Sequence, residues 1–285
     1  MTFEAKYYEA PVFWSQGMIE DPDNLKRLEK TIRLVPANAK NLIDIGCGNG
    51  VFARLLKRRF PALQITCVDR SAAALEQVVA DEKVRCEVIK LPFGDRSFDC
   101  ASCLEVIEHL TVEDYKQALA ELTRIARTAV IISVPYKEAI EKNVDACPKC
   151  RTIFNRDLHF RSFDDAIFAG LLSDFGFRIE ETTIPVANTH YLGFRTYYKL
   201  QRKLQGMPDR SEMFMSPICP LCGYTPPDQA QASPASAPTL SVPDSASAIT
   251  RNGGIKDFVK RCWPKQTTPG YWIVGRFTRS QADAA

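Results

Sequence analysis

The segment of this chain best suited to hold a ligand is a short apolar strand that runs into a turn with three glycines. Residues 41–50 read Asn-Leu-Ile-Asp-Ile-Gly-Cys-Gly-Asn-Gly. The apolar residues suit a buried strand, Asp44 places a carboxylate near its carboxyl end, and the glycines let the backbone approach a ligand where a Cβ would obstruct. Residues 51–59 read as a helix whose amino terminus faces the same ligand. The segment therefore predicts a site for a nucleoside cofactor.

The spacing of the glycines distinguishes between two cofactors. A dinucleotide-binding turn has the pattern G-x-G-x-x-G, whereas Gly46, Gly48 and Gly50 form G-x-G-x-G, with Asp44 two residues before the first glycine. This pattern resembles motif I of the class I S-adenosylmethionine-dependent methyltransferases, in particular the ubiquinone and menaquinone type. The resemblance implies that Asp44 lies near the amino-acid part of the cofactor and that the glycines pack under it. The same spacing argues against a nicotinamide-dependent dehydrogenase.

Two later segments match the same family in the same order. Residues 63–69 read as a second buried strand that ends in Asp69, where an α/β nucleoside site needs a carboxylate for the ribose hydroxyls. The alternative for Asp69 is an acid at the start of the next helix. Residues 87–99 resemble the family's acid-x-x-x-Leu-Pro-Phe…Ser-Phe-Asp run, whose acid reaches the adenine amino group. This chain has Glu87 where the family usually has Asp. The residues that the resemblance predicts for cofactor binding are Asp44, Gly46, Cys47, Gly48, Gly50, Asp69, Arg70, Glu87, Leu91 and Leu104.

A third match places acids and a histidine after a predicted fourth strand, within residues 98–110. Methyl transfer is an in-line displacement that needs alignment of the acceptor and, for a hydroxyl acceptor, removal of a proton. Glu105, Glu108 and His109 are therefore the catalytic candidates, with His109 as the base. The alternative for His109 is a packing or capping residue at the junction between strand and helix.

The remaining pattern predicts an α/β fold with a doubly wound, mostly parallel seven-stranded sheet and helices on both faces. Helical spacing over residues 113–126 and 163–176 alternates with buried strands over 129–135 and 177–184. The family resemblance places the last strand, residues 271–278, antiparallel between the fifth and sixth strands. The expected organisation is an N-terminal helical and aromatic lid (1–37), the cofactor-binding core (38–136), a first insertion with a zinc knuckle (137–160), a core helix and strand (161–186), a second insertion with a zinc knuckle (187–226), a disordered Ala/Ser/Pro-rich loop (227–250), and a final helix and core strand (251–279).

Two Cys-Pro-x-Cys knuckles predict a metal site. Cys147 and Cys150 form the first pair, and Cys219 and Cys222, followed by Gly223, form the second. In a reducing compartment two such pairs indicate one tetrahedral four-cysteine zinc site rather than two disulfides. Both pairs follow parallel strands, so both insertions leave from the same edge of the sheet as the cofactor. We expect a structural zinc, because four thiolates leave no open coordination position.

The other cysteines are expected not to bind zinc. Cys100 and Cys103 have the same spacing as the knuckles but lie within an apolar strand, where their odd separation sends the thiols to opposite faces. Cys47, Cys67, Cys86 and Cys262 are likewise treated as non-ligands of zinc.

Composition is that of an ordinary globular protein. The chain has 285 residues, of which 45% are hydrophobic and 25% charged, and a net charge of +3 that does not by itself indicate nucleic-acid binding. No run of eighteen apolar residues and no signal-peptide pattern is present at the amino terminus, so no membrane span and a cytoplasmic location are expected.

The acceptor is expected to be a small molecule or glycan, methylated on oxygen, and two alternatives are open. Glu105, Glu108, His109 and His159 resemble the metal-binding set of the small-RNA 3′-terminal 2′-O-methyltransferases, and such a set could hold Mg²⁺ or Mn²⁺. A similar Glu-x-x-Glu-His run also occurs in ubiquinone-type enzymes without that role. The third possibility is a zinc-bearing scaffold without catalysis, which the complete set of cofactor motifs disfavours.

Overall fold

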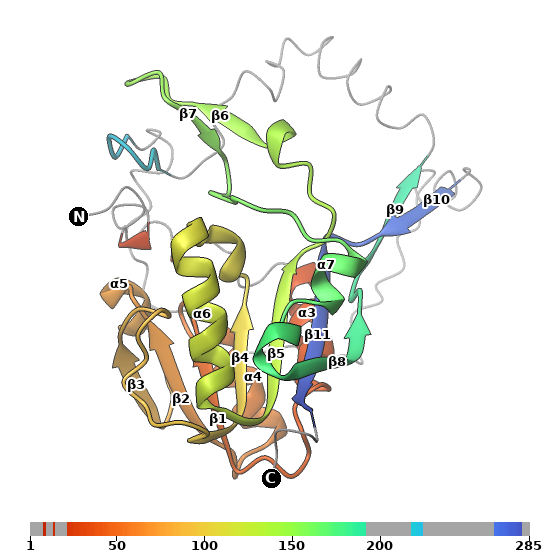
Figure 1. The fold of residues 1–285 in the computed structure, drawn as a ribbon. Helices are drawn as coiled ribbons and strands as arrows, with labels where there is room; N and C mark the ends of the chain where they lie inside the picture. The colour runs from red at the N-terminus through yellow and green to blue at the C-terminus, as the bar shows by residue number, and fades with distance from the viewer. Residues whose placement is uncertain (1–7, 10–13, 15–21, 192–217, 225–264, 281–285) are drawn as a thin grey trace, which may run out of the picture.

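The centre of the protein is a seven-stranded sheet with the strand order β3-β2-β1-β4-β5-β11-β8 (Figure 1). The computed structural model describes residues 8–9, 14, 22–191, 218–224 and 265–280. The strands of this sheet are β1 (Asn41–Ile45), β2 (Gln64–Asp69), β3 (Glu82–Arg85), β4 (Phe98–Leu104), β5 (Ala126–Pro135), β8 (Phe177–Thr183) and β11 (Trp272–Arg279). The first five are parallel, and β11 pairs antiparallel with both β5 and β8. The predicted doubly wound sheet and the predicted place of the last strand are both confirmed.

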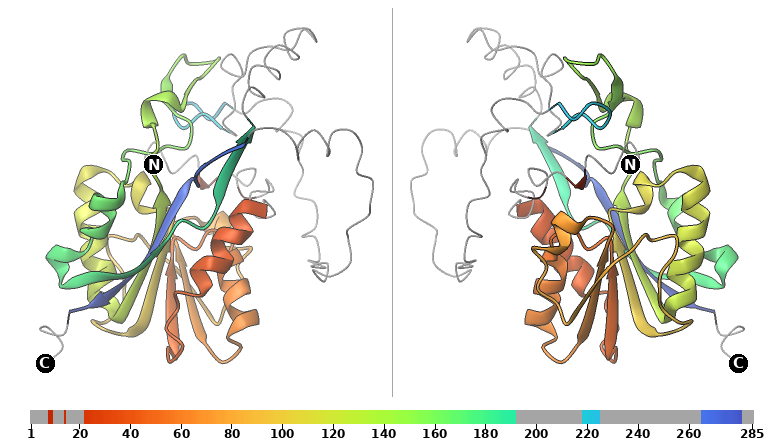
Figure 2. Two further views of the ribbon diagram at one scale, coloured as in Figure 1. Left: turned by 90° about the vertical axis from the view of Figure 1, so that its right-hand side faces the viewer. Right: turned by 90° about the vertical axis from the view of Figure 1, so that its left-hand side faces the viewer.

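Helices cover the two faces of the sheet (Figure 2). One face carries α3 (Pro22–Ile32), α4 (Val51–Arg59) and the short α5 (Ala72–Leu75). The opposite face carries α6 (Val112–Ile125) and α7 (Asp165–Ala169). Thr111 caps α6, since its side chain accepts a hydrogen bond from the amide of Asp114.

The alternation of side chains along the central strands divides the core into two layers. Leu42 packs in the layer under α3 and α4, whereas its neighbour Ile43 packs in the layer under α6. Cys100 and Cys103 of β4 likewise lie in different layers, both fully buried. The prediction that these two thiols point to opposite faces is confirmed.

Several elements differ from the sequence-based expectation. The residues of the third strand, β3, were not identified from the sequence, because Glu-Lys-Val-Arg has no apolar pattern. The predicted helix over 163–176 is shorter: α7 is followed by a separate 3₁₀ turn, Ser173–Phe175, which ends at Gly176 with a φ of 74°. A second small sheet, β9 (Ala187–Tyr191) with β10 (Lys265–Pro269), was also not predicted. The expected loop over 227–250 and the helix expected just after it lie outside the described residues.

The first insertion follows the carboxyl end of β5, and β9, the described start of the second insertion, follows the carboxyl end of β8 (Figure 2). The first contains the 3₁₀ turn Ile140–Lys142 and an antiparallel hairpin, β6 (Val144–Ala146) with β7 (Ile153–Asn155). The second approaches this hairpin with residues 218–224, and the two pack in a small separate core. Among the described residues, no helix is both long and apolar enough to cross a membrane.

Candidate cofactor and metal sites

The glycine turn after β1 requires glycine for geometric reasons. Gly46, Gly48 and Gly50 all have positive φ, at 68°, 53° and 75°. A Cβ on Gly46 would lie 2.3 Å from Cγ2 of Val106, and a Cβ on Gly48 would lie 2.9 Å from the ring of Trp14. The turn is anchored to the neighbouring strand, because the amide of Gly46 donates to the carbonyl of Val68 at 2.8 Å. Side chains are thus excluded where the turn approaches the adjoining cavity.

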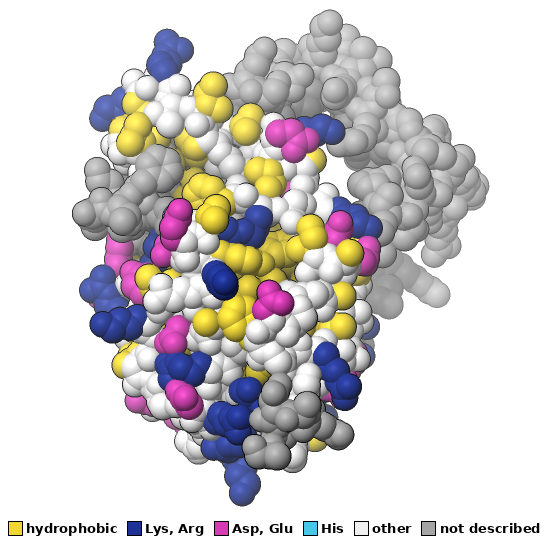
Figure 3. Space-filling view, viewed as in Figure 1, with side chains coloured by type: hydrophobic (Ala, Val, Ile, Leu, Met, Phe, Trp, Pro, Cys, Tyr) yellow, Lys and Arg dark blue, Asp and Glu magenta, His cyan; other side chains and the backbone are white. Residues whose placement is uncertain are grey.

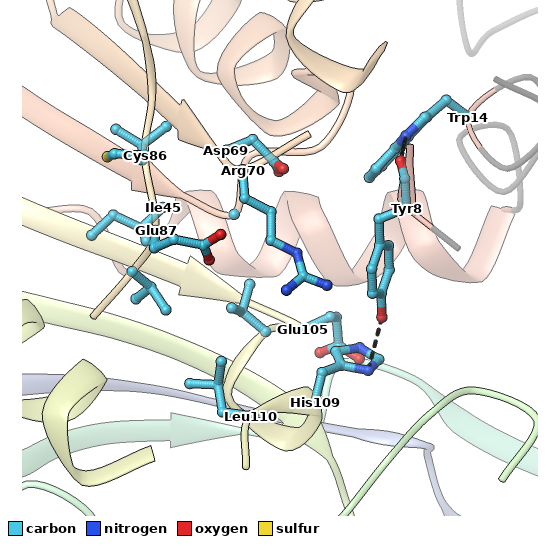
Figure 4. Close-up of a pocket in the computed structure, with 14 residues that line it drawn as sticks. Tyr8, Trp14, Ile45, Asp69, Arg70, Cys86, Glu87, Glu105, His109 and Leu110 are labelled. Atoms are coloured by element: carbon cyan, nitrogen blue, oxygen red, sulfur yellow. Dashed lines mark hydrogen bonds between the residues drawn. The ribbon is translucent and has the colours of Figure 1, made fainter. Parts of the chain in front are cut away.

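A cavity opens beside this turn, at the carboxyl ends of β1, β2 and β4 (Figure 4). The space within it is about 680 Å³, which includes space open to solvent. Six predicted site residues line it: Gly46, Asp69, Arg70, Glu87, Glu105 and His109. The remaining walls are Tyr8, Trp14, Ile45, Val68, Cys86, Val88, Val106 and Leu110. The cavity therefore has mainly apolar walls with acidic and basic groups at a few positions.

Asp69 holds the glycine turn against the end of β2. Its Oδ2 accepts from the amide of Gly48 at 2.9 Å, and its Oδ1 accepts from the amide of Ser71 at 2.8 Å. Burial raises the pKa of Asp69, and these hydrogen bonds oppose the shift. The carboxylate is thus fixed in place at the cavity wall, as a ribose ligand would need to be.

Asp44 lies deeper than expected. It is only 2% exposed, accepts a hydrogen bond from Ser102 Oγ at 2.8 Å, and is not among the residues that line the cavity. Burial, with a smaller effect of the charge on Asp69, raises the pKa of Asp44 to about 7. The other predicted cofactor ligands that do not line this cavity are Cys47, Gly48, Gly50, Leu91 and Leu104.

Glu105 is presented to the cavity by an unusual backbone conformation and a buried arginine. Its φ is 57°, in the left-handed region, and its amide donates to the carbonyl of Ser133 at 3.0 Å. Ser133 Oγ donates to Glu105 Oε1 at 2.7 Å and accepts from Arg27 Nη1 at 2.8 Å. Arg27 Nη1 also lies 3.7 Å from Oε1. Arg27 was not predicted as a site residue, because nothing in the sequence distinguishes it from the other basic residues of its amphipathic helix.

His109 connects the cavity to the amino-terminal segment. The Tyr8 hydroxyl lies 3.1 Å from His109 Nδ1, as the dashed line in Figure 4 shows. The backbone carbonyl of Leu158 lies 3.3 Å from the same nitrogen. Burial and the charge on His159 lower the pKa of His109, so the ring is neutral at physiological pH. Tyr8 and Trp14 line the cavity where the sequence placed an aromatic lid.

Glu108 faces His109 and His159 rather than solvent. Its side chain is fully buried, and neither carboxylate oxygen has a hydrogen-bond partner among the described residues. Burial raises the pKa of Glu108 well above its ordinary value, with a further contribution from Glu105. Possible ligand atoms of Glu108, His109 and His159 lie within 4.8 Å of one another, and His159 Nδ1 contacts the Glu138 carboxylate. Glu105, the fourth member of the predicted set, is not part of this group.

The four knuckle cysteines meet at one point. Cys147 Sγ lies 3.7 Å from Cys222 Sγ, and Cys150 Sγ lies 3.7 Å from Cys219 Sγ. All four sulfurs are within 4.8 Å of one another. In a tetrahedral site with zinc–sulfur bonds of about 2.3 Å, neighbouring sulfurs are separated by about 3.8 Å. The donor set and its spacing therefore fit a zinc ion, and the distances exclude disulfides between these pairs.

The two knuckles also share one backbone geometry. The amide of Cys147 donates to Thr152 O at 2.9 Å, and the amide of Cys219 donates to Tyr224 O at 2.8 Å. Each first cysteine carbonyl in turn accepts from the amide four residues later, which is Arg151 in one knuckle and Gly223 in the other. Two separate insertions thus supply equivalent halves of one site.

Comparison with known proteins agrees with the cofactor motifs. Residues 43–133 match the family described as "Methyltransferase domain". The demethylmenaquinone methyltransferase of Thermotoga maritima is 31% identical over 100 residues, covering 33% of this chain and 42% of that protein. The O-methyltransferase cnsE of Penicillium expansum is 32% identical over 116 residues, covering 37% of this chain and 40% of that protein. An uncharacterized protein of Methanocaldococcus jannaschii is 30% identical over 126 residues, covering 43% of this chain and 52% of that protein. The chain thus spans about half or less of the curated relatives it matches.

The fold is similar to that of a solved structure over a longer stretch of the chain than the family match covers. A candidate methyltransferase from Bacillus halodurans C-125 aligns with a TM-score of 0.50 at 14% identity, covering 89% of this chain and 99% of that one. Residues 43–133 are thus similar to methyltransferase domains, within a Rossmann-like fold.

Proposed function

We propose that this protein transfers a methyl group from S-adenosylmethionine to an oxygen atom of a small-molecule or glycan acceptor. The observation that carries the proposal is the glycine turn, where Gly46 borders the cavity and Asp69 holds Gly48 by its amide. Asp69 would take the ribose hydroxyls and Glu87 the adenine amino group. The sulfonium of the bound cofactor supplies the methyl group. Ser71, by fixing Asp69, and Val106, by packing on Gly46, keep this half of the site rigid.

The acceptor would enter on the side of His109. The apolar walls of the cavity suit an organic acceptor, and its acidic and basic side chains suit polar substituents on that acceptor. On the face of the molecule seen in Figure 3, hydrophobic side chains gather in a hollow with Lys or Arg side chains beside it. His109 is our proposed base, with Glu105 and Glu108 beside it. Tyr8 orients the His109 ring by its contact with Nδ1, and the ring nitrogen that carries no proton would take one from an acceptor hydroxyl.

Calorimetric titration with S-adenosylhomocysteine tests the cofactor. Asp69→Ala should abolish binding, because it removes the proposed ribose ligand and loosens the turn. Asp174→Ala replaces an exposed aspartate far from the cavity and should bind as the wild type does. Absence of binding by the wild type would reject the methyltransferase proposal and favour a scaffold.

We further propose that a structural zinc joins Cys147, Cys150, Cys219 and Cys222 in a cytoplasmic protein. The support is the sulfur spacing of 3.7 Å in both pairs and the matching backbone of the two knuckles. Zinc would contribute folding free energy to the insertions and no bond-making step. Metal analysis of the purified protein, with and without a thiol reagent, tests this assignment.

A second candidate is divalent-metal-assisted 2′-O-methylation of RNA. It is favoured by one observation, the buried Glu108 carboxylate with no hydrogen-bond partner in the described structure, next to two imidazoles. Two imidazoles and a carboxylate would suit Mn²⁺, and Glu138 would orient His159. Mn²⁺ titration followed by electron paramagnetic resonance should show a site that Glu108→Gln removes and Glu113→Gln, on the exposed start of α6, retains. Equal Mn²⁺ binding by both variants would reject this candidate.

A further inference from the structure

The cavity has two ends, which differ in the strands that supply them. Asp69 ends β2 and Glu87 follows β3 on one side, whereas Gly46 and Glu105 follow β1 and β4 on the other. Figure 4 shows Glu105 beside His109, on the far side of the cavity from Glu87. With the adenosine at Asp69 and Glu87, as proposed above, the amino-acid part of the cofactor extends toward Gly46 and Glu105.

The amino-acid part of S-adenosylmethionine carries an α-ammonium group, which calls for a carboxylate partner. Asp44 was expected to lie near it. However, Asp44 is 2% exposed, bonds to Ser102 and does not line the cavity. Glu105 does line the cavity, and 23% of its side chain is exposed. Of these two acids, only Glu105 is accessible to a ligand at this end.

Glu105 is also held in a fixed position. Its Oε1 accepts from Ser133 and lies 3.7 Å from Arg27 Nη1. Arg27 is itself fixed, because its Nε and Nη2 donate to Asn24 Oδ1 at 3.2 and 2.7 Å and its guanidinium lies over the ring of Trp272. These contacts engage one oxygen of Glu105 and leave Oε2 able to accept from a ligand.

We propose that Glu105, held in place by Arg27 through Ser133, binds the α-ammonium group of S-adenosylmethionine. The inference rests on the proposed function and assigns Glu105 to cofactor binding rather than to catalysis. Arg27 acts as a positioning residue. It lies in α3, outside residues 43–133, so a helix beyond the matched methyltransferase domain would complete the cofactor site.

Two nucleoside ligands test the two ends of the cavity independently. S-adenosylhomocysteine carries the amino-acid part, and 5′-methylthioadenosine lacks it. Calorimetry should show that Glu105→Gln weakens binding of the first ligand by about 10- to 100-fold, the usual effect of a charge-assisted hydrogen bond, while binding of the second is unchanged. Ser133→Ala, a small change that removes the link to Arg27, should weaken S-adenosylhomocysteine binding to a lesser degree with the same selectivity.

Matched controls distinguish this effect from a loss of folding. Glu29→Gln in α3 and Arg33→Met just after it change exposed residues and should bind both ligands as the wild type does. Arg27→Met should reproduce the selective loss of Glu105→Gln. The inference is overturned by equal losses for both ligands in Glu105→Gln, or by a selective loss in Asp44→Asn that Glu105→Gln lacks. A wild type that binds neither ligand would instead reject the proposed function itself.

Discussion

Arg151 and Gly223 occupy the same position in the two cysteine knuckles, directly after the second cysteine, and both adopt the left-handed backbone conformation. Their φ angles are 62° and 71°. Glycine enters this region without cost, whereas a residue with a Cβ pays roughly 1–2 kcal/mol. The first knuckle therefore reaches the same geometry as the second at the expense of backbone strain.

We predict that Arg151→Gly stabilises the zinc-loaded protein by roughly 0.5–1 kcal/mol, since relief of strain is partly offset by the greater freedom of glycine in the unfolded chain. Thermal unfolding measures the change. Arg151→Ala keeps a Cβ and serves as the control, with no gain expected. Conversely, Gly223→Ala should destabilise by about 1 kcal/mol from backbone strain alone, because a Cβ at Gly223 meets no atom within 4 Å. Equal stability of Arg151→Gly and Arg151→Ala would show that the strain is absent.

Removal of zinc should unfold the two insertions and spare the sheet. Cys147 and Cys219 are buried in a small core with Phe154, Leu158 and Ile218, separate from the two layers of the sheet. We expect Cys219→Ser to lose the metal and to expose the hairpin β6–β7 to protease, while the sheet retains its protection from hydrogen exchange. Cys100→Ser is the control for loss of a buried thiol and should retain zinc. A zinc content that survives Cys219→Ser would contradict the site.

The cofactor turn should not accept any side chain at Gly46. We predict that Gly46→Ala abolishes S-adenosylhomocysteine binding and lowers the free energy of unfolding by roughly 2–4 kcal/mol, from positive φ together with a clash at Val106. The double variant with Val106→Ala should recover part of the stability, because it removes the clash and leaves the strain. Gly94→Ala is the control, since a Cβ there has no neighbour within 4 Å. Wild-type affinity in Gly46→Ala would show that the turn does not hold the cofactor.

The sequence predicted those features that depend on local pattern. Alternation places Cys100 and Cys103 in different core layers, and glycine spacing locates the turn beside the cavity. The two Cys-x-x-Cys pairs are separated by 68 residues in the sequence and lie together in the structure, as expected. Both insertions leave from the carboxyl ends of strands, which brings the pairs to the same edge of the sheet.

Features that depend on tertiary packing were not predictable. The edge strand β3 is built from a polar segment that becomes a strand only by pairing with β2. Arg27 looks like any basic residue of an amphipathic helix, yet it is 6% exposed and contacts Ser133 on β5. The burial of Asp44 could not be predicted for the same reason, since a carboxylate after an apolar run can face either the ligand or the core.

Asp44 gives a prediction about pH. Its pKa is raised to about 7 in the folded protein from an ordinary value of 3.8, mainly by burial. The folded state therefore binds more protons than the unfolded state between these values, and the contribution of Asp44 to stability is present below about pH 4 and is lost as the pH rises to about 7. Asp44→Asn cannot ionise. Relative to the wild type, the free energy of unfolding of Asp44→Asn should rise across this window by up to about 4 kcal/mol. This energy corresponds to the shift of about three pKa units.

Denaturant unfolding of both proteins at intervals from pH 4 to 8 measures this difference. Glu108 and His109 also titrate with shifted pKa values, but they are present in both proteins, so their effects largely cancel in the comparison. Asp69 interacts with Asp44 through its charge, so this interaction is part of the measured difference. The informative quantity is the change with pH of the difference in free energy of unfolding, because any fixed cost of the asparagine amide beside Ser102 is independent of pH. Asp174→Asn, at an exposed site, should show no such change. If the free energies of unfolding of Asp44→Asn and the wild type differ by the same amount at every pH, Asp44 ionises normally. Its carboxylate then reaches solvent or a cation that offsets its burial.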